Sequence, residues 1–127
     1  MEAFIEKFRK KYHIPATDLQ LLIDCMQEIH FKKKEIIVGE GEKNTNLYLI
    51  KQGIWRGHYL KDGVDTTIWF ASAGEAAFSV WGYADNSASP ISIEVCCDSL
   101  AYCISGQDLN TLYSSSIELA NLGRKLM

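Results

Sequence analysis

The chain has 127 residues, of which 47% are hydrophobic and 23% charged, and its formal net charge is −3. This composition is typical of one globular domain and excludes a disordered chain. An acidic balance also argues against a nucleic-acid-binding surface, and we interpret the basic run Lys32–Lys34 as a solvated strand entrance. No apolar run approaches the roughly 20 residues of a membrane helix, and the N-terminus does not read as a signal peptide. We therefore expect a soluble, cytoplasmic protein with no membrane partner.

Two helices are predicted over residues 1–28. Aromatic residues recur every four positions from Phe4 to Tyr12, and Pro15 ends that pattern. Thr17 and Gln20 then have the spacing of a capping box. A stripe of apolar residues follows, formed by Leu19, Leu22, Ile23 and Met26.

Short runs of β-branched and aromatic residues dominate from residue 29 to residue 105. Asp62-Gly63 separates two of these runs and is a strong signal for a hairpin turn. Seven short strands without a βαβ rhythm indicate an antiparallel sandwich or jelly roll. The expected strands are Glu35–Val38, Asn46–Ile50, Ile54–Leu60, Thr66–Phe70, Ala76–Val80, Ile91–Val95 and Leu100–Ile104.

Residues 106–127 return to a helical pattern. Gly106–Tyr113 is expected to form a short helix, and Ser115 and Glu118 have capping-box spacing before a second one. The stripe of that second helix is still running at Met127, which indicates that the natural protein continues. Its members are Leu119, Leu122 and Leu126.

The potential metal ligands do not form a metal-site pattern. There is no Cys-x-x-Cys pair, and the histidines lie far apart in the sequence, so zinc and iron–sulfur spacings are absent. We expect no metal, and free, buried thiols in a reducing compartment. The residues considered are Cys25, Cys96, Cys97, Cys103, His13, His30 and His58.

An ordered set of motifs over residues 15–127 resembles the cyclic nucleotide-binding domain of CRP/FNR-type bacterial transcription regulators, the cyclic-AMP receptor family. The motifs are Glu35–Glu42, Leu47–Gly53, Asp62-Gly63, Thr66–Phe70, Ala73–Glu75, Asp98-Ser99 before Leu100–Ile104, and Ser115–Leu119. The resemblance implies a mainly β domain: an antiparallel double-stranded β-helix or jelly roll (a β-roll) with N-terminal helices and the start of a C-terminal dimerisation helix. In that family the helix joins two subunits into a homodimer. It leads to a helix-turn-helix domain that contacts DNA and that this chain lacks.

The resemblance also implies where a ligand would bind, in a phosphate-binding cassette. The family pattern is Phe-Gly-Glu-Leu followed, about ten residues after the Glu, by an Arg that clamps the cyclic phosphate. Counting back from Asp98-Ser99, Phe78 and Ser79 replace the Gly and the Glu, and Ser89 replaces the Arg. No Arg or Lys occurs between Val64 and Asn121. The cassette positions, which are the candidate ligand-binding residues, are Gly74, Glu75, Phe78, Ser79, Val80, Ser89, Pro90 and Ile91.

Two further sets of residues leave alternatives open around this site. Trp69, Phe78, Trp81 and Tyr83 either line a pocket for a less anionic ligand or simply fill the roll. Arg56 and His58 lie two apart on one strand, so they share a face. They either supply a substitute cation or occupy solvent-facing positions on an edge strand.

The expected function is a regulatory module that senses an effector but binds cyclic AMP only weakly, with no required cofactor. A ligand-free dimerisation module of the same fold is the alternative. A metal-dependent barrel enzyme of cupin type is disfavoured, because it would need clustered histidines, and no catalytic pair is indicated among Glu75, Asp85 and Glu94. The stripe of Leu119, Leu122 and Leu126 is either the dimer seam or packing against the chain's own roll.

Overall fold

The computed structural model describes residues 3–125, and within them the mainly β, helix-flanked fold is confirmed. Two four-stranded antiparallel sheets have the orders β1-β8-β3-β6 and β2-β7-β4-β5. The chain repeatedly crosses from one sheet to the other, which is the winding of a β-roll. The strands are β1 (Gln27–Phe31), β2 (Ile36–Val38), β3 (Leu47–Gln52), β4 (Ile54–Lys61), β5 (Val64–Ser72), β6 (Ala76–Ala77), β7 (Ser92–Val95) and β8 (Ser99–Ile104).

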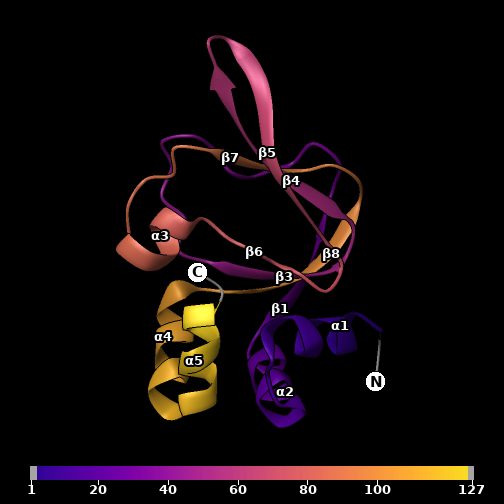
Figure 1. The fold of residues 1–127 in the computed structure, drawn as a ribbon, viewed down its shortest axis with the longest axis vertical. Coiled ribbons are helices and arrows are strands. Elements are labelled where there is room, and N and C mark those ends of the chain that lie inside the picture. Colours follow the sequence, from indigo (N-terminus) through magenta and orange to yellow (C-terminus); the bar gives the residue numbers. More distant parts are fainter. Residues whose placement is uncertain (1–2, 126–127) are drawn as a thin grey trace.

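Helices cover only one of the two sheets. The helices α1 (Ala3–Tyr12), α2 (Ala16–Asp24), α4 (Gly106–Ser115) and α5 (Ile117–Lys125) gather beside the sheet that contains β3 and β8 (Figure 1). The short helix α3 (Val80–Asp85) lies at the side of the roll, close to the ends of α4 and α5 that face the roll. The three layers are therefore helices, one sheet, and the second sheet.

Strand β3 explains how this layering creates two hydrophobic cores. Leu47 and Leu49 point toward the helices, whereas Tyr48 and Ile50 point into the roll, because successive side chains of a strand face opposite ways. All four are buried. A strand covered on both faces reads as a continuous apolar run, as Leu47–Ile50 does.

The predicted hairpin is confirmed. Asp62 and Gly63 have φ values of 53° and 81°, as a two-residue turn with both central residues in the left-handed region requires. Strands β4 and β5 on either side of it extend beyond the rest of the roll (Figure 1).

Three element predictions were wrong. Strand β1 was missed, because Glu28 and His30 interrupt any apolar run in its sequence. It spans the boundary that was expected between residues 28 and 29. The predicted strand Ala76–Val80 is only two residues long and leads into α3. No side chain caps α2, whose N-cap is Pro15, so the predicted Thr17 capping box does not form.

The C-terminal helices are present as predicted, with a cap displaced by one residue. The Oγ atom of Ser116, not of Ser115, accepts a hydrogen bond from the backbone N–H of Leu119 at 3.2 Å. Leu119 and Leu122 are 0% and 2% exposed and pack in their own chain's core beside α2 and α4. This packing is one of the two alternatives for the leucine stripe; a seam with a second copy stays a prediction. Leu126 lies outside the described residues.

The four cysteines are free, but the expectation that they are buried was wrong, because Cys25 is exposed and the other three are only partly buried. Among residues 3–125, no three His, Cys, Asp or Glu side chains are grouped to hold a metal ion. None of the helices described is long and apolar enough to cross a membrane.

Candidate functional site

The cassette positions begin at a turn that joins β5 to β6. Gly74 has φ +86°, and a Cβ atom there would lie 2.6 Å from Cδ of Lys7, so the position requires glycine. Its backbone N–H donates to the carbonyl of Ile50 at 2.9 Å. This turn is therefore fixed against both β3 and helix α1.

Glu75 holds the same turn together instead of pointing at an open site. Its Oε1 atom accepts hydrogen bonds from the backbone N–H of Ser72 at 2.9 Å and from the Ser72 hydroxyl at 3.0 Å, and its other oxygen pairs with Lys11 of α1. Burial acts to raise the pKa of Glu75, but the bonds from Lys11 and Ser72 outweigh it, and the pKa is lowered from 4.5. Glu75 is thus a tie between α1 and the β5–β6 turn.

Ser79, which the resemblance predicts to replace the Glu of the cassette, caps α3. It is 1% exposed, and its Oγ atom accepts a hydrogen bond from the backbone N–H of Gly82 at 3.3 Å. Phe78 before it packs against Tyr83, with ring centroids 4.9 Å apart, while Val80 after it is exposed. Phe78 and Val80 have no polar side-chain group, and the Ser79 hydroxyl is buried at the start of α3.

Ser89, which the resemblance predicts to replace the clamping Arg, bonds through its hydroxyl to the nearby backbone of Ile91. The Oγ atom donates to the carbonyl of Ile91 at 2.7 Å and accepts from the Ile91 N–H at 3.2 Å. The Ser89 backbone is also paired with the loop before β3, through Gly41 and Glu42. Ser89 is 1% exposed and Ile91 is buried, whereas Pro90 is exposed. The cassette loop is therefore closed by short, neutral hydrogen bonds and carries no cation.

Aromatic side chains fill the interior of the roll. Trp55 is 0% exposed and makes edge contacts with Phe31 and Tyr48, at ring-centroid distances of 5.3 and 5.5 Å. Its indole Nε1 is buried and has no hydrogen-bond partner among the described residues. Tyr48 is anchored by the side-chain amides of Asn44 and Asn46, which donate to its hydroxyl at 3.2 and 3.3 Å. The interior between the two sheets is thus occupied by packed side chains.

A hollow of about 240 Å³ lies at the edge of the roll, between α1, β5 and β6. Trp69, Phe70 and Phe78 line it, together with the ion-paired Lys11 and Glu75. Among the described residues that line it, Lys11 is the only cation. Sequence reasoning missed this lysine, because the basic last turn of α1 is visible in the sequence but its position beside β5 depends on the fold.

The four aromatic residues predicted to line one pocket do not converge. Trp69 lies over Gly57, where a Cβ atom would be 2.3 Å from its ring, and Trp69 and Phe78 share the small hollow. Tyr83 lines a separate, larger pocket beside α4 and α5, and Trp81 lines neither. Trp69 also packs against the core between the sheets, together with Trp55 and Tyr48, so the roll-filling alternative is confirmed for Trp69.

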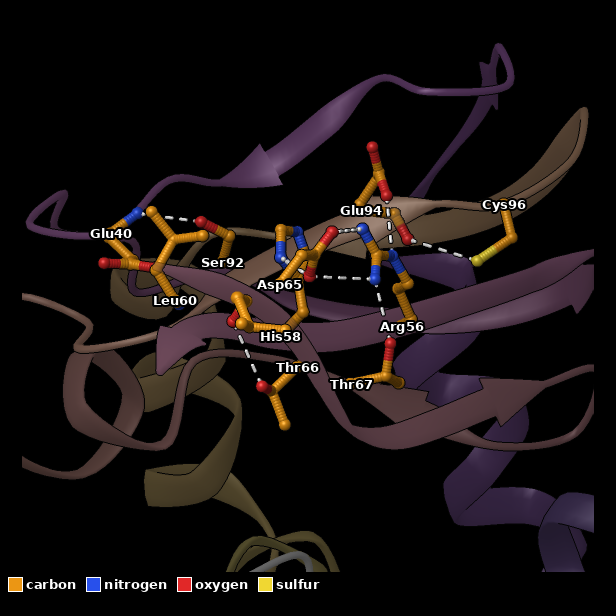
Figure 2. Close-up of polar contacts among 11 residues, drawn as sticks. Glu40, Arg56, His58, Leu60, Asp65, Thr66, Thr67, Ser92, Glu94 and Cys96 are labelled. Carbon is orange, nitrogen blue, oxygen red and sulfur yellow. Dashed lines mark hydrogen bonds and ion pairs between the residues drawn. The ribbon is translucent and has the colours of Figure 1, made fainter. Parts of the chain in front are cut away.

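Arg56 and His58 are on the outer face of the second sheet (Figure 2), so the substitute-cation hypothesis was wrong. Their neighbour Trp55 points inward, and alternation along the strand places Arg56 on the opposite face. The alternative was also wrong in part, because β4 lies between β7 and β5 and is not an edge strand.

Arg56 and His58 share one network of polar contacts with acidic residues on this face. The Arg56 guanidinium donates to Glu94 at 2.7 Å, to Asp65 at 2.8 Å and to Thr67 at 2.8 Å, and Nδ1 of His58 lies 3.2 Å from Asp65. Hydrogen bonds to Asp65 and then Glu94 raise the pKa of Arg56, and the bond to Arg56 lowers the pKa of Asp65. The guanidinium is therefore engaged by carboxylates outside the roll.

Solved structures share this architecture across most of the chain at low sequence identity. The catabolite activator protein of Thermus thermophilus is 19% identical with a TM-score of 0.79, over 91% of this chain and 54% of that one. A cyclic nucleotide-binding domain of Methylobacillus flagellatus is 18% identical with a TM-score of 0.77, over 97% and 71%. The regulatory domain of Toxoplasma gondii PKA, solved with cAMP, is 17% identical with a TM-score of 0.71, over 88% and 45%. The chain thus spans about half the length of the first and third of these structures.

The family assignment comes from a sequence model. No curated protein matches the chain. The family model described as "Cyclic nucleotide-binding domain" matches residues 28–116, from β1 to the N-cap of α5, which is more than half of the chain. This chain therefore belongs to the cyclic nucleotide-binding domain family, in agreement with its β-roll fold.

Proposed function

We propose that this chain is the regulatory domain of a CRP/FNR-type bacterial transcription regulator whose cassette does not bind cyclic AMP tightly. The fold shared with the catabolite activator protein of Thermus thermophilus supports the regulator class. The domain is non-catalytic and cytoplasmic in this proposal. DNA would be contacted through a helix-turn-helix domain outside these 127 residues.

The observation that carries the proposal is the state of Ser89. A cyclic phosphate needs a cation or several free donors, and Ser89 offers a single hydroxyl that is already bonded to Ile91. Losing a charge-assisted hydrogen bond costs roughly 1.5–3 kcal/mol, which is tenfold to more than a hundredfold in affinity. Trp55 and Tyr48 add a steric obstacle, because a nucleotide between the sheets would have to displace packed aromatic rings.

Calorimetric titration with cyclic AMP and cyclic GMP, each to millimolar concentration, tests this proposal. We expect no measurable binding, while the Toxoplasma gondii PKA domain titrated in parallel serves as the positive control. Micromolar binding to a single site would overturn the proposal. In that case Lys11→Ala would show whether Lys11, the cation at the edge of the roll, replaces the missing Arg.

A ligand-free dimerisation module is the second candidate, and the filled roll favours it. Trp55 is fully buried, so the interior leaves no room for an effector without rearrangement. If two copies pair through α5, the contact would use that helix's exposed face, where Ile117 is 78% exposed. Sedimentation equilibrium of the chain alone tests this: a dimer with a Kd below about 10 μM supports the module, and a monomer contradicts it.

A further inference from the structure

A pocket larger than the hollow beside α1 lies outside the roll, where α3, α4 and α5 meet. Its volume is about 820 Å³, which is within the range of small-molecule sites in proteins. In Figure 1, α3 lies close to the ends of α4 and α5 that face the roll. None of the cassette positions Gly74, Glu75, Phe78, Ser79, Val80, Ser89, Pro90 and Ile91 lines it.

Contacts that only glycine permits fix the walls of this pocket. A Cβ atom at Gly82 of α3 would lie 1.8 Å from the backbone oxygen of Asn44, and one at Gly106 of α4 would lie 2.8 Å from Thr45. A Cβ atom at Gly123 of α5 would lie 2.8 Å from the Tyr83 hydroxyl. At Gly82 and Gly106 the helix backbone approaches Asn44 and Thr45, and at Gly123 it approaches the Tyr83 and Tyr113 side chains. A larger residue at any of the three glycines would therefore disturb the pocket walls.

Two phenols meet in the pocket wall. The hydroxyls of Tyr83 on α3 and Tyr113 on α4 lie 2.5 Å apart, and one donates to the other. Such a pair keeps one further hydrogen to donate and has free lone pairs. It can therefore either donate a hydrogen bond to a ligand hydroxyl or accept one from it. Burial raises the pKa of both phenols, which keeps them neutral at physiological pH.

The remaining polar lining favours an uncharged ligand. Asn86, Gln107 and Asn110 contribute side-chain amides, each with donors and an acceptor. The two charged residues in the lining, Asp85 and Arg124, have opposite signs, so the pocket has no net attraction for an ion of either sign. Amides and phenols match hydroxyl groups, which both donate and accept.

We propose that this pocket binds an uncharged, hydroxyl-bearing ring compound of nucleoside or glycoside size. Such a ligand would contact α3 of the cassette segment and α5 of the C-terminal pair at the same time. Its presence would therefore favour one arrangement of the two elements. The pocket does not depend on what the roll interior binds. The test of this site and the test of the proposed function can therefore fail separately.

Saturation-transfer NMR followed by calorimetry tests the site with three probes: adenosine, methyl α-D-glucopyranoside and adenosine 5′-monophosphate. We expect adenosine or the glucoside to bind with a Kd of about 1 mM or tighter. Binding of adenosine alone identifies a nucleoside site, and binding of the glucoside alone a sugar site. Failure of both uncharged probes at 10 mM would overturn the proposal, as would tenfold tighter binding of the monophosphate than of adenosine.

Two tryptophan substitutions on the same helix locate the binding. Asn110→Trp places a large ring in the pocket and is expected to weaken binding at least tenfold, because Asn110 is an exposed position that lines it. Thr111→Trp is the matched control, since Thr111 is the next residue of α4, is also exposed and does not line the pocket. Thermal unfolding of both variants verifies that they fold. Equal loss of affinity in both, or no loss in Asn110→Trp, would place the ligand elsewhere.

Discussion

Ser89 and Glu75, two of the predicted cassette positions, have side chains that form hydrogen bonds within the chain. Ser89 closes a turn with Ile91, and Glu75 joins Ser72 to Lys11. Both arrangements are local, with partners two or three residues away, apart from the contact to α1. The identity of these residues could be read from the sequence, but the direction of their side chains depends on hydrogen bonds that only the folded backbone provides.

The tie made by Glu75 gives a prediction about acid stability. Because its pKa in the folded chain is below the ordinary value of 4.5, its contribution is present above pH 4.5 and is lost as pH falls through the folded value. Glu75→Gln should lower the free energy of unfolding by about 0.5–1 kcal/mol at pH 7, a value discounted for the exposure of Lys11. The difference between the two proteins should shrink as pH falls through the lowered pKa of Glu75.

Thermal or urea unfolding from pH 3 to pH 7 measures this difference. Glu35→Gln is the control, because Glu35 is an exposed carboxylate in the loop before β2. It should unfold like the unsubstituted chain throughout. If Glu75→Gln kept the same difference at pH 3 as at pH 7, the ion pair would not be the source of its effect.

Helix α5 shows at the scale of an element how one sequence pattern supports two interpretations. A leucine stripe predicts a buried face, but periodicity does not say whether the chain's own core or a second copy covers it. The structure buries Leu119 and Leu122 against α2 and α4, and leaves Ile117 exposed. Whatever partner the helix has, these two leucines already contribute to the fold of one chain.

Substitutions on the two faces of α5 should therefore separate stability from association. Leu122→Ala should lower the free energy of unfolding by about 2–5 kcal/mol, because it leaves a cavity in the core. Ile117→Ala, on the exposed face, should change it by less than about 0.5 kcal/mol. Urea unfolding and sedimentation equilibrium of the two variants distinguish the roles.

If Leu122→Ala left the unfolding midpoint unchanged and lowered the mass measured by sedimentation, Leu122 would belong to a dimer interface and not to the core of one chain. If two copies pair through the exposed face, Ile117→Asp should lower the mass while leaving unfolding of the monomer unchanged.

For the whole molecule, the fold class and most strands could be predicted because the roll's strands are apolar runs bounded by turn residues. Strand β1 was missed because only Ile29 and Phe31 are apolar in its five residues. The start of α3 was predicted as a strand because Ala76–Val80 has a strand-like composition, and the cap at Ser79 that begins the helix depends on local geometry.

The contents of the site were harder to predict than its location. The cassette segment and its missing Arg are what the resemblance to the family implies, once its pattern is counted back from Asp98-Ser99. The occupation of the interior by Trp55, and the approach of Lys11 to Glu75, are contacts between residues far apart in sequence. Such contacts depend on how the sheets are stacked, which no local pattern records.

The one-sided covering of the two sheets has a consequence for how the molecule opens. Strand β8 pairs with β1 on one side and β3 on the other, and lies between the helices and the roll interior. Strand β5 is paired only with β4, and its outer face carries no helix. Local opening at β5 should therefore require much less free energy than opening at β8.

Native-state hydrogen exchange resolves this gradient. The hydrogen-bonded amides of β8 should exchange only through global unfolding, and those of β5 at least about 100-fold faster. Equal protection of the two strands would contradict this gradient. With the gradient present, thermal fluctuation would loosen the hairpin and its ion-pair network while the helix-backed sheet stays closed. The molecule would then have a compliant side and a rigid side, and the pocket between α3, α4 and α5 lies on the rigid one.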